Sequence, residues 1–121
     1  MKYLLLIYDN EAAQAKRTSE EMTAMYQEYG KFSQQIAESG NLIGGNELKP
    51  ISTATTVRVR DGKRVVTDGP FAETKEQLGG YYLVEAKDLD EAIAIAGQIP
   101  SVRSGSIEVR PIMVHAQGAR P

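Results

Sequence analysis

Residues 2–8, KYLLLIY, constrain the fold of this chain more than any other segment. The run is apolar at odd and even positions alike, which is typical of a central β-strand covered on both faces. The same pattern is compatible with a short buried helix. A chain of 121 residues supports one compact domain with a modest core. The segment therefore predicts an element in the middle of that single domain.

A long amphipathic helix is predicted over residues 18–39. Thr18 and Glu21 have the spacing of a capping box, in which a hydroxyl and a carboxylate satisfy the free amides of a helix start. Apolar residues then recur at steps of three and four, namely Met22, Met25, Tyr29, Phe32 and Ile36. Gly40 supplies the stop, because glycine tolerates the left-handed conformation.

The remaining sequence predicts shorter elements. In chain order they are a loop over 9–17, a weak strand over 42–48, a hairpin of 55–60 with 63–67, a strand over 79–86, a helix from 88 to 100 and a strand over 105–114. Asp61-Gly62 between β-branched runs is a strong signal for a hairpin turn. Pro111 predicts an edge position or a bulge for the last strand. Residues 115–121 are expected to form a flexible tail.

This order of elements predicts a fold of the α+β class. Without the inserted hairpin, residues 1–114 form a split βαβ unit of the ferredoxin-like type. Such a unit places both helices on one face of the sheet and leaves the other face bare. A mostly apolar bare face needs a cover, and a second copy of the chain is the natural one. The sequence therefore predicts a homodimer.

Composition removes several classes of function. The 14 basic and 16 acidic residues give a net charge of −2, so a nucleic-acid partner is not expected. The chain has no cysteine and one histidine, which argues against a metal site, and no cofactor is expected. No apolar run is long enough to cross a bilayer, and the N-terminus does not resemble a signal peptide. We expect a cytoplasmic protein that does not bind membranes.

One motif resembles a known family. Residues 67–81 read TDGPFAETKEQLGGY, with Asp68-Gly69-Pro70-Phe71 near the start. This segment, together with KYLLLIY at the beginning and Val109-Arg110-Pro111 at the end, is similar to the YCII-related family in its DGPF-type branch. The resemblance extends over nearly the whole chain. It implies a dimeric α+β barrel, similar to the fold of muconolactone isomerases and of small heme- or quinone-handling monooxygenases.

The resemblance also implies a candidate for catalysis. YCII-type members carry a proposed catalytic pair, a histidine on the first helix and an aspartate beside the glycine-proline turn. Asp68 matches that aspartate, whereas no residue matches the histidine, because the one histidine of this chain is His115 in the tail. Asp68 therefore has two interpretations. It acts as a general base or a polar anchor for a ligand, or its carboxylate stabilises the turn.

Aromatic and basic residues complete the predicted site. The candidates for ligand contact are Tyr8, Tyr26, Phe71, Tyr81 and Arg110. A buried phenol needs a hydrogen-bond partner, and an arginine fork suits an anionic group. Core packing is the competing role for the aromatic residues. Residues 73–77 are either a solvated loop or the rim of the cleft.

Two hypotheses about function follow. The first is a dimeric protein that binds a small molecule in a pocket between the helical layer and the paired sheets. If this protein is an enzyme, cofactor-independent lyase, isomerase or dehalogenase chemistry using Asp68 fits best. The second is a non-catalytic regulatory or protein-interaction module, linked to a sigma-factor system as some relatives are. The absent histidine favours the second hypothesis.

Overall fold

The computed structural model describes residues 1–115. The predicted tail, residues 115–121, lies outside this range except for His115. In chain order the helices and strands are β1 (Lys2–Asp9), α1 (Glu11–Gln14), α2 (Ser19–Glu38), β2 (Leu42–Glu47), β3 (Thr55–Arg60), β4 (Lys63–Asp68), β5 (Gln77–Glu85), α3 (Leu89–Ala96) and β6 (Ser106–Pro111). Short 3₁₀ turns lie at Ile51–Thr53 and Pro100–Arg103.

Four strands form an antiparallel sheet in the order β2-β5-β1-β6. This order, with α2 after β1 and α3 after β5, is that of the ferredoxin-like α+β fold and confirms the predicted class. Residues 2–8 lie in β1, between β5 and β6. The last strand lies at an edge, as Pro111 predicts, because proline cannot donate to a neighbouring strand.

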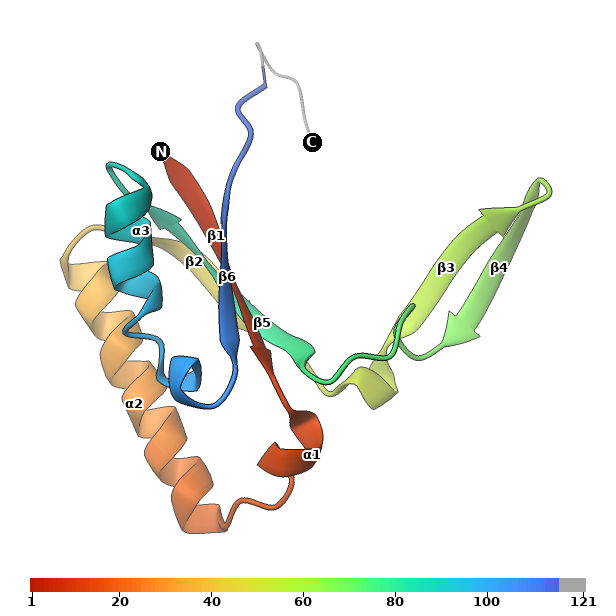
Figure 1. Ribbon diagram of the computed structural model, residues 1–121, viewed down its shortest axis with the longest axis horizontal. Coiled ribbons are helices and arrows are strands. Elements are labelled where there is room, and N and C mark those ends of the chain that lie inside the picture. Colours follow the sequence, from red (N-terminus) through yellow and green to blue (C-terminus); the bar gives the residue numbers. More distant parts are fainter. Residues whose placement is uncertain (116–121) are drawn as a thin grey trace.

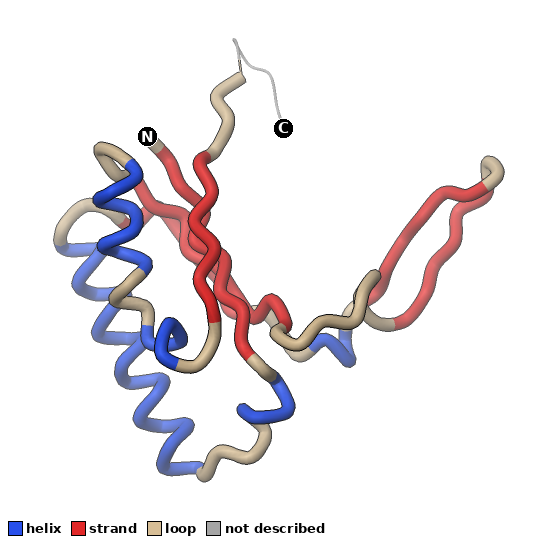
Figure 2. The backbone as a smooth tube through the Cα atoms, in the orientation of Figure 1, coloured by secondary structure: helices blue, strands red, loops and turns tan. Residues whose placement is uncertain are grey.

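Both long helices lie on one face of this sheet (Figures 1 and 2). Alternate residues of β1 point to that face, and Tyr3, Leu5 and Ile7 are buried there. They pack in one cluster with Phe32 and Ile36 of α2 and with residues of α3. We call the other side of the sheet the open face. Leu4, Leu6 and Tyr8 of β1 point to it and are only partly buried.

Helix α2 begins and ends as predicted. Thr18 and Glu21 make both bonds of the capping box, with distances of 2.9 and 3.1 Å. At the other end Gly40 has a φ of 82°, in the left-handed region that the stop requires. Only Phe32 and Ile36 of the predicted apolar stripe are buried. Met22, Met25 and Tyr29 are half-buried, because they line a cavity described below.

Two predicted segments differ from the structure. Residues 9–17 are not only a loop, because the Asn10 side chain caps a short helix, α1, by accepting the Ala13 amide at 2.8 Å. The second helix stops at Ala96 with Gly97 as its cap, and Pro100 instead begins a 3₁₀ turn. Helix α3 turns its small Ala92 and Ala96, with Ile95, to the sheet, so Leu89 and Ile93 remain exposed.

Strands β3 and β4 form a separate two-stranded sheet, which we call the arm (residues 55–68). Its turn is the predicted Asp61-Gly62, with φ values of 53° and 73°. Two successive positive φ angles match the tight hairpin turns that follow the twist of the strands. In Figure 1 the arm projects from the body on the side of the sheet away from the helices.

Candidate functional site

A cavity of about 690 Å³ lies between the sheet and the first half of α2. This volume is within the range of small-molecule pockets, which are mostly apolar with a few polar groups. The end of β1, α1, α2, β2, β5 and the turn at Ser101 all contribute to its wall. Ile7, Met22, Met25 and Leu48 supply apolar surface. The apolar stripe of α2 extends past the core, and its residues Met22 and Met25 face this cavity instead.

Asp9, the last residue of β1, is a buried carboxylate in the wall of this cavity. Asp9 is only 6% exposed to solvent. One oxygen accepts the Asn10 amide at 2.8 Å, and the other accepts the hydroxyl of Ser104 at 2.8 Å and the Gln14 amide at 3.4 Å. The Arg17 guanidinium stands 3.8 Å away. Buried charges are retained when hydrogen bonds and a counter-charge compensate for lost water, as here.

Tyr29 of α2 brings a phenol to the same cavity. Its hydroxyl lies 2.5 Å from the buried hydroxyl of Ser101. Burial raises the pKa of the Tyr29 phenol above its ordinary value, the hydrogen bonds with Ser101 oppose this effect, and the charges of Tyr82 and Asp9 add to it. The phenol is therefore neutral at physiological pH. It offers a hydroxyl for hydrogen bonding while Asp9 offers a carboxylate.

Two further phenols line the cavity. Tyr82 lies 2.7 Å from the Ser33 hydroxyl, and its ring meets Phe32 edge to face with centroids 5.1 Å apart. Tyr26 donates to Glu47 at 3.1 Å, and this hydrogen bond raises the pKa of the Tyr26 phenol. Tyr26, which the sequence analysis predicts as a ligand contact, is one of the residues that line the cavity.

The charges around the cavity are unequal. Three carboxylates, Asp9, Glu11 and Glu47, line it together with one guanidinium, Arg17. An excess of negative charge in a partly enclosed space attracts cations and disfavours anions. The lining thus suits a neutral or positively charged ligand better than an acid.

At the rim of the cavity, residues at the start of α1 contact the chain both before and after the arm. The Glu11 carboxylate accepts the Ile51 amide at 3.1 Å, just before β3. The Glu11 amide donates to the Gln77 side chain at 2.9 Å, and Asn10 donates to the Lys75 carbonyl at 3.2 Å, both after β4. These contacts join α1 to the arm on both sides. Of the predicted cleft rim, Gln77 lines the cavity.

The glycine pair at the start of β5 shapes the cavity wall. Ile7 pairs with Gly80 and Tyr8 with Leu78, so Gly79 is the extra residue of a β-bulge. A Cβ on Gly80 would stand 2.9 Å from the Asn46 carbonyl oxygen of β2. Gly79 therefore forms the bulge, and Gly80 permits the close approach of β2 and β5.

The structure distributes the other predicted site residues over three places. Tyr81 is among the residues that border the cavity, but it pairs with Leu6, so its side chain points to the open face, where its hydroxyl accepts the Asn46 amide at 2.9 Å. Tyr8 and Arg110 meet on the open face at Glu108, which accepts from Tyr8 at 3.4 Å and from Arg110 at 3.1 Å. Asp68 and Phe71 lie at the base of the arm, both exposed. Neither of these two lines the cavity.

Sequence reasoning missed Asp9, Tyr29 and Ser101 as site residues. A signal for Asp9 is present in β1, because it continues the alternation of Tyr3, Leu5 and Ile7 toward the helices. A carboxylate in phase with three core residues indicates a buried charge that needs partners. Ser104 and Arg17, which supply them, come from distant or irregular segments and carry no such signal.

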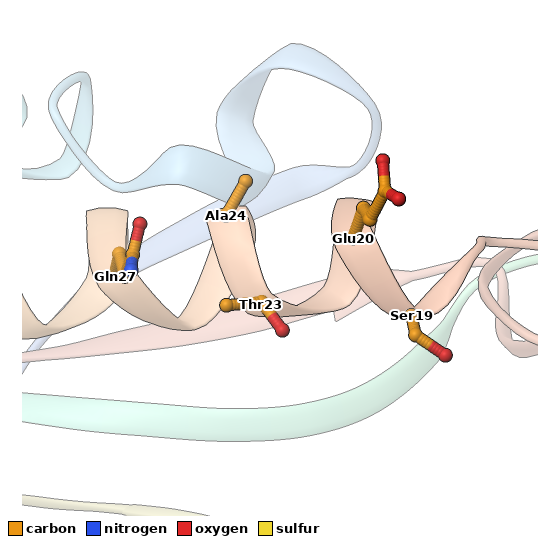
Figure 3. A pocket seen from close by; sticks show the side chains of 5 residues that line it. All are labelled: Ser19, Glu20, Thr23, Ala24 and Gln27. Atoms are coloured by element: carbon orange, nitrogen blue, oxygen red, sulfur yellow. The ribbon is translucent and has the colours of Figure 1, made fainter.

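Three further observations concern residues 1–115. A hollow of about 300 Å³ lies along α2 between Ser19 and Gln27 and is lined by that one helix, so no second element encloses it (Figure 3). No group of three or more acidic or histidine side chains in this part of the chain is arranged to hold a metal ion. None of the helices described is long and apolar enough to span a membrane.

Comparison with known proteins gives the family. The sequence profile of the YCII-related domain matches residues 1–115. An uncharacterised protein of Rhizobium meliloti (strain 1021) is 36% identical over 123 residues, which cover 100% of this chain and 99% of that relative. Both matches extend over essentially the full length, from β1 through the glycine-proline turn to β6. The chain belongs to the YCII-related family.

Proposed function

We propose that this protein binds a small, mostly apolar molecule in the cavity between α2 and the sheet. The observation that carries the proposal is the convergence of a buried carboxylate, Asp9, and a neutral phenol, Tyr29, on one cavity of about 690 Å³. A concave apolar site with few, well-positioned polar groups is the usual form of a ligand pocket.

The lining indicates the class of ligand. Carboxylates accept hydrogen bonds and attract positive charge, so an amine or a hydroxyl group of the ligand pairs with Asp9, Glu11 or Glu47. The methionines and Ile7 accommodate an apolar body. We therefore propose amines, alcohols, phenols and neutral lactones as ligands, and small acids as poor ones.

If the bound molecule reacts, Asp9 and Tyr29 are the groups available for proton transfer. A carboxylate accepts a proton and a neutral phenol donates one, which is the division of labour that lyase and isomerase reactions require. Asp68, the earlier candidate, remains a prediction. It is exposed at the end of β4 and acts on a ligand only where another surface approaches the arm.

A comparison of two aspartates tests the site. Wild type, Asp9→Asn and Asp68→Asn are screened by thermal shift against amines, alcohols, phenols, lactones and acids. A ligand at one hundred times its dissociation constant stabilises the wild type by about 2.7 kcal/mol, which is a shift of several degrees. We expect Asp9→Asn to lose this shift, because it removes the charge while keeping the shape, and Asp68→Asn to retain it.

The controls separate binding from folding. The ligand-induced shift of Asp9→Asn is measured from that variant's own unfolding midpoint without ligand. A second variant, Met25→Trp, narrows the cavity and leaves the hydrogen bonds of Asp9 unchanged. Loss of the shift in Met25→Trp supports the cavity. A ligand whose shift survives both variants and disappears in Asp68→Asn would place the site at the base of the arm and contradict this proposal.

We further propose that a second copy of the chain covers the open face. Leu4, Leu6 and Leu83 form the partly buried apolar centre of that face. Ile43 on β2 is 46% exposed beside them. Exposed apolar patches of this kind mark association surfaces, and identical chains most often associate through a two-fold axis.

Sedimentation velocity tests the homodimer. The wild type is expected to sediment as a dimer of the 13.2 kDa chain at micromolar concentration. Leu6→Glu introduces a charge into the covered face and is expected to give a monomer. Ile93→Glu, an equal change on the exposed side of α3, is the matched control and should remain a dimer. A wild type that is monomeric at 100 μM contradicts the dimer.

A further inference from the structure

The arm exposes an apolar surface that the body of its own chain does not cover. Val57 pairs with Val66 across the hairpin, so both point to one side, with Val59 beside them. Their exposed fractions are 59%, 56% and 64%. We call this surface the valine face. A two-stranded hairpin is marginally stable in water unless something packs on it, so the valine face needs a partner.

The opposite side of the arm is basic. Arg58, Arg60 and Lys63 share that side in the register of the hairpin, whereas Arg64 pairs with Val59 and borders the valine face. The arm as a whole has four basic and two acidic side chains, whereas the chain has 14 basic and 16 acidic ones. The rest of the chain therefore holds ten basic and fourteen acidic side chains, and it opposes the arm in sign. Charge of opposite sign steers association and orients the partners.

The position of the arm places it beside the surface that a second copy would occupy. The arm projects from the β2–β5 end of the sheet, on the side away from α2 and α3 (Figure 1). The open face is on that same side. Strands of six residues extend by about 20 Å at ~3.3 Å per residue, which is enough to reach past a packed sheet onto the next molecule.

We infer that the arm docks onto the second copy of the chain through its valine face. This inference rests on the homodimer proposed above. Two-fold symmetry makes the exchange reciprocal, so that each protomer gives an arm and receives one, and Arg64, which pairs with Val59 on the docking side, meets a body that is acidic overall. The arm base, with Asp68 and Phe71, then belongs to the dimer interface, and Phe71, 78% exposed in the single chain, becomes covered.

A paired substitution tests the inference. Val57→Glu with Val66→Glu places two charges on the valine face, and Val65→Glu with Thr67→Glu places the same two charges on the other side of the same hairpin. The dissociation constant of the dimer is measured by sedimentation for both. We expect the first pair to raise it at least tenfold and the second pair to raise it less than threefold.

The outcomes separate the arm from the dimer itself. A wild type that dimerises, with the first pair leaving its dissociation constant unchanged, overturns the arm inference and leaves the homodimer standing. Equal weakening by both pairs also overturns it, because added negative charge alone would then explain the effect. A wild type that is monomeric overturns the homodimer first and the inference with it. Ligand binding in the cavity is measured separately and is independent of all three outcomes.

Cross-linking gives a second readout that does not depend on affinity. The chain has no cysteine, so Val57→Cys provides a unique site for a photo-activated cross-linker. With a mixture of ¹⁴N- and ¹⁵N-labelled protein, we expect mixed-isotope peptide pairs from Val57→Cys. Val65→Cys, on the opposite side, is the matched control and is expected to yield few such pairs. Cross-links confined to peptides of one isotope would overturn the inference.

Discussion

Gly105→Ala is expected to lower the free energy of unfolding by about 3 kcal/mol, the upper end of the range for overpacking. A Cβ at this position would stand 2.0 Å from the Tyr8 carbonyl oxygen and 3.0 Å from the Asp9 Cα. Both atoms belong to the backbone of β1, so no flexible side chain can move aside. The segment just before β6 and the end of β1 must separate instead.

Gly105→Ala is also expected to alter the candidate site. Ser104, the neighbour of Gly105, donates to Asp9 at 2.8 Å, and any separation of the two strands lengthens that bond. We therefore expect weaker ligand binding together with the loss of stability. Denaturant unfolding measures the stability, and the thermal-shift screen measures the binding.

Gly44→Ala is the matched control for this change. A Cβ on Gly44, at the edge strand β2, has no atom within 4 Å. Its effect should stay within about 0.5 kcal/mol, as for other surface substitutions. If Gly105→Ala unfolds at the wild-type denaturant midpoint, the close approach of Gly105 to Tyr8 is wrong.

Leu5→Ala is expected to destabilise the fold by about 3 kcal/mol. Leu5 is fully buried at the centre of the core, between Tyr82 of β5 and Val109 of β6. Deleting a buried leucine side chain removes its transfer free energy and leaves a cavity that the neighbours fill only in part. The change is measured by denaturant unfolding at submicromolar protein concentration, where association contributes least.

Leu6→Ala provides the comparison, because Leu6 is the adjacent leucine and points to the open face. At low protein concentration we expect a loss of about 1 kcal/mol, less than half that of Leu5→Ala, since Leu6 is only partly buried. At high concentration the loss should grow if a second copy covers the open face. Equal losses for both leucines at low concentration would contradict the assignment of the two faces.

Much of the fold was predictable because local chemistry decides it. The capping box at Thr18, the glycine stop at Gly40 and the Asp61-Gly62 turn depend on residues close together in sequence, and all three occur as predicted. The order of the strands in the ferredoxin-like sheet follows from the sequence of elements and the short connections between them. Family membership likewise follows from the full-length match.

The candidate site was predicted only in part. Tyr26 lines the cavity, and Tyr81 borders it with its side chain on the open face. Tyr8 and Arg110 also lie on the open face, and Asp68 and Phe71 lie at the base of the arm. The motif that identifies the family drew attention to Asp68. Asp9 carries no motif, and its burial depends on Ser104, 95 residues further along the chain.

The sequence by itself determined the strands, the long helix α2 and the hairpin turn, because these depend on near neighbours and on alternation along the backbone, whereas it missed the short helix α1 and the end of α3. The tertiary structure alone decided where the apolar stripe of α2 leaves the core and borders a cavity, and which carboxylate is enclosed there. It also decided that the arm extends away from the helices (Figure 1). The physical reason is that the burial of a side chain depends on which distant segments pack against it. The alternation of residues along one strand carries no information about those segments.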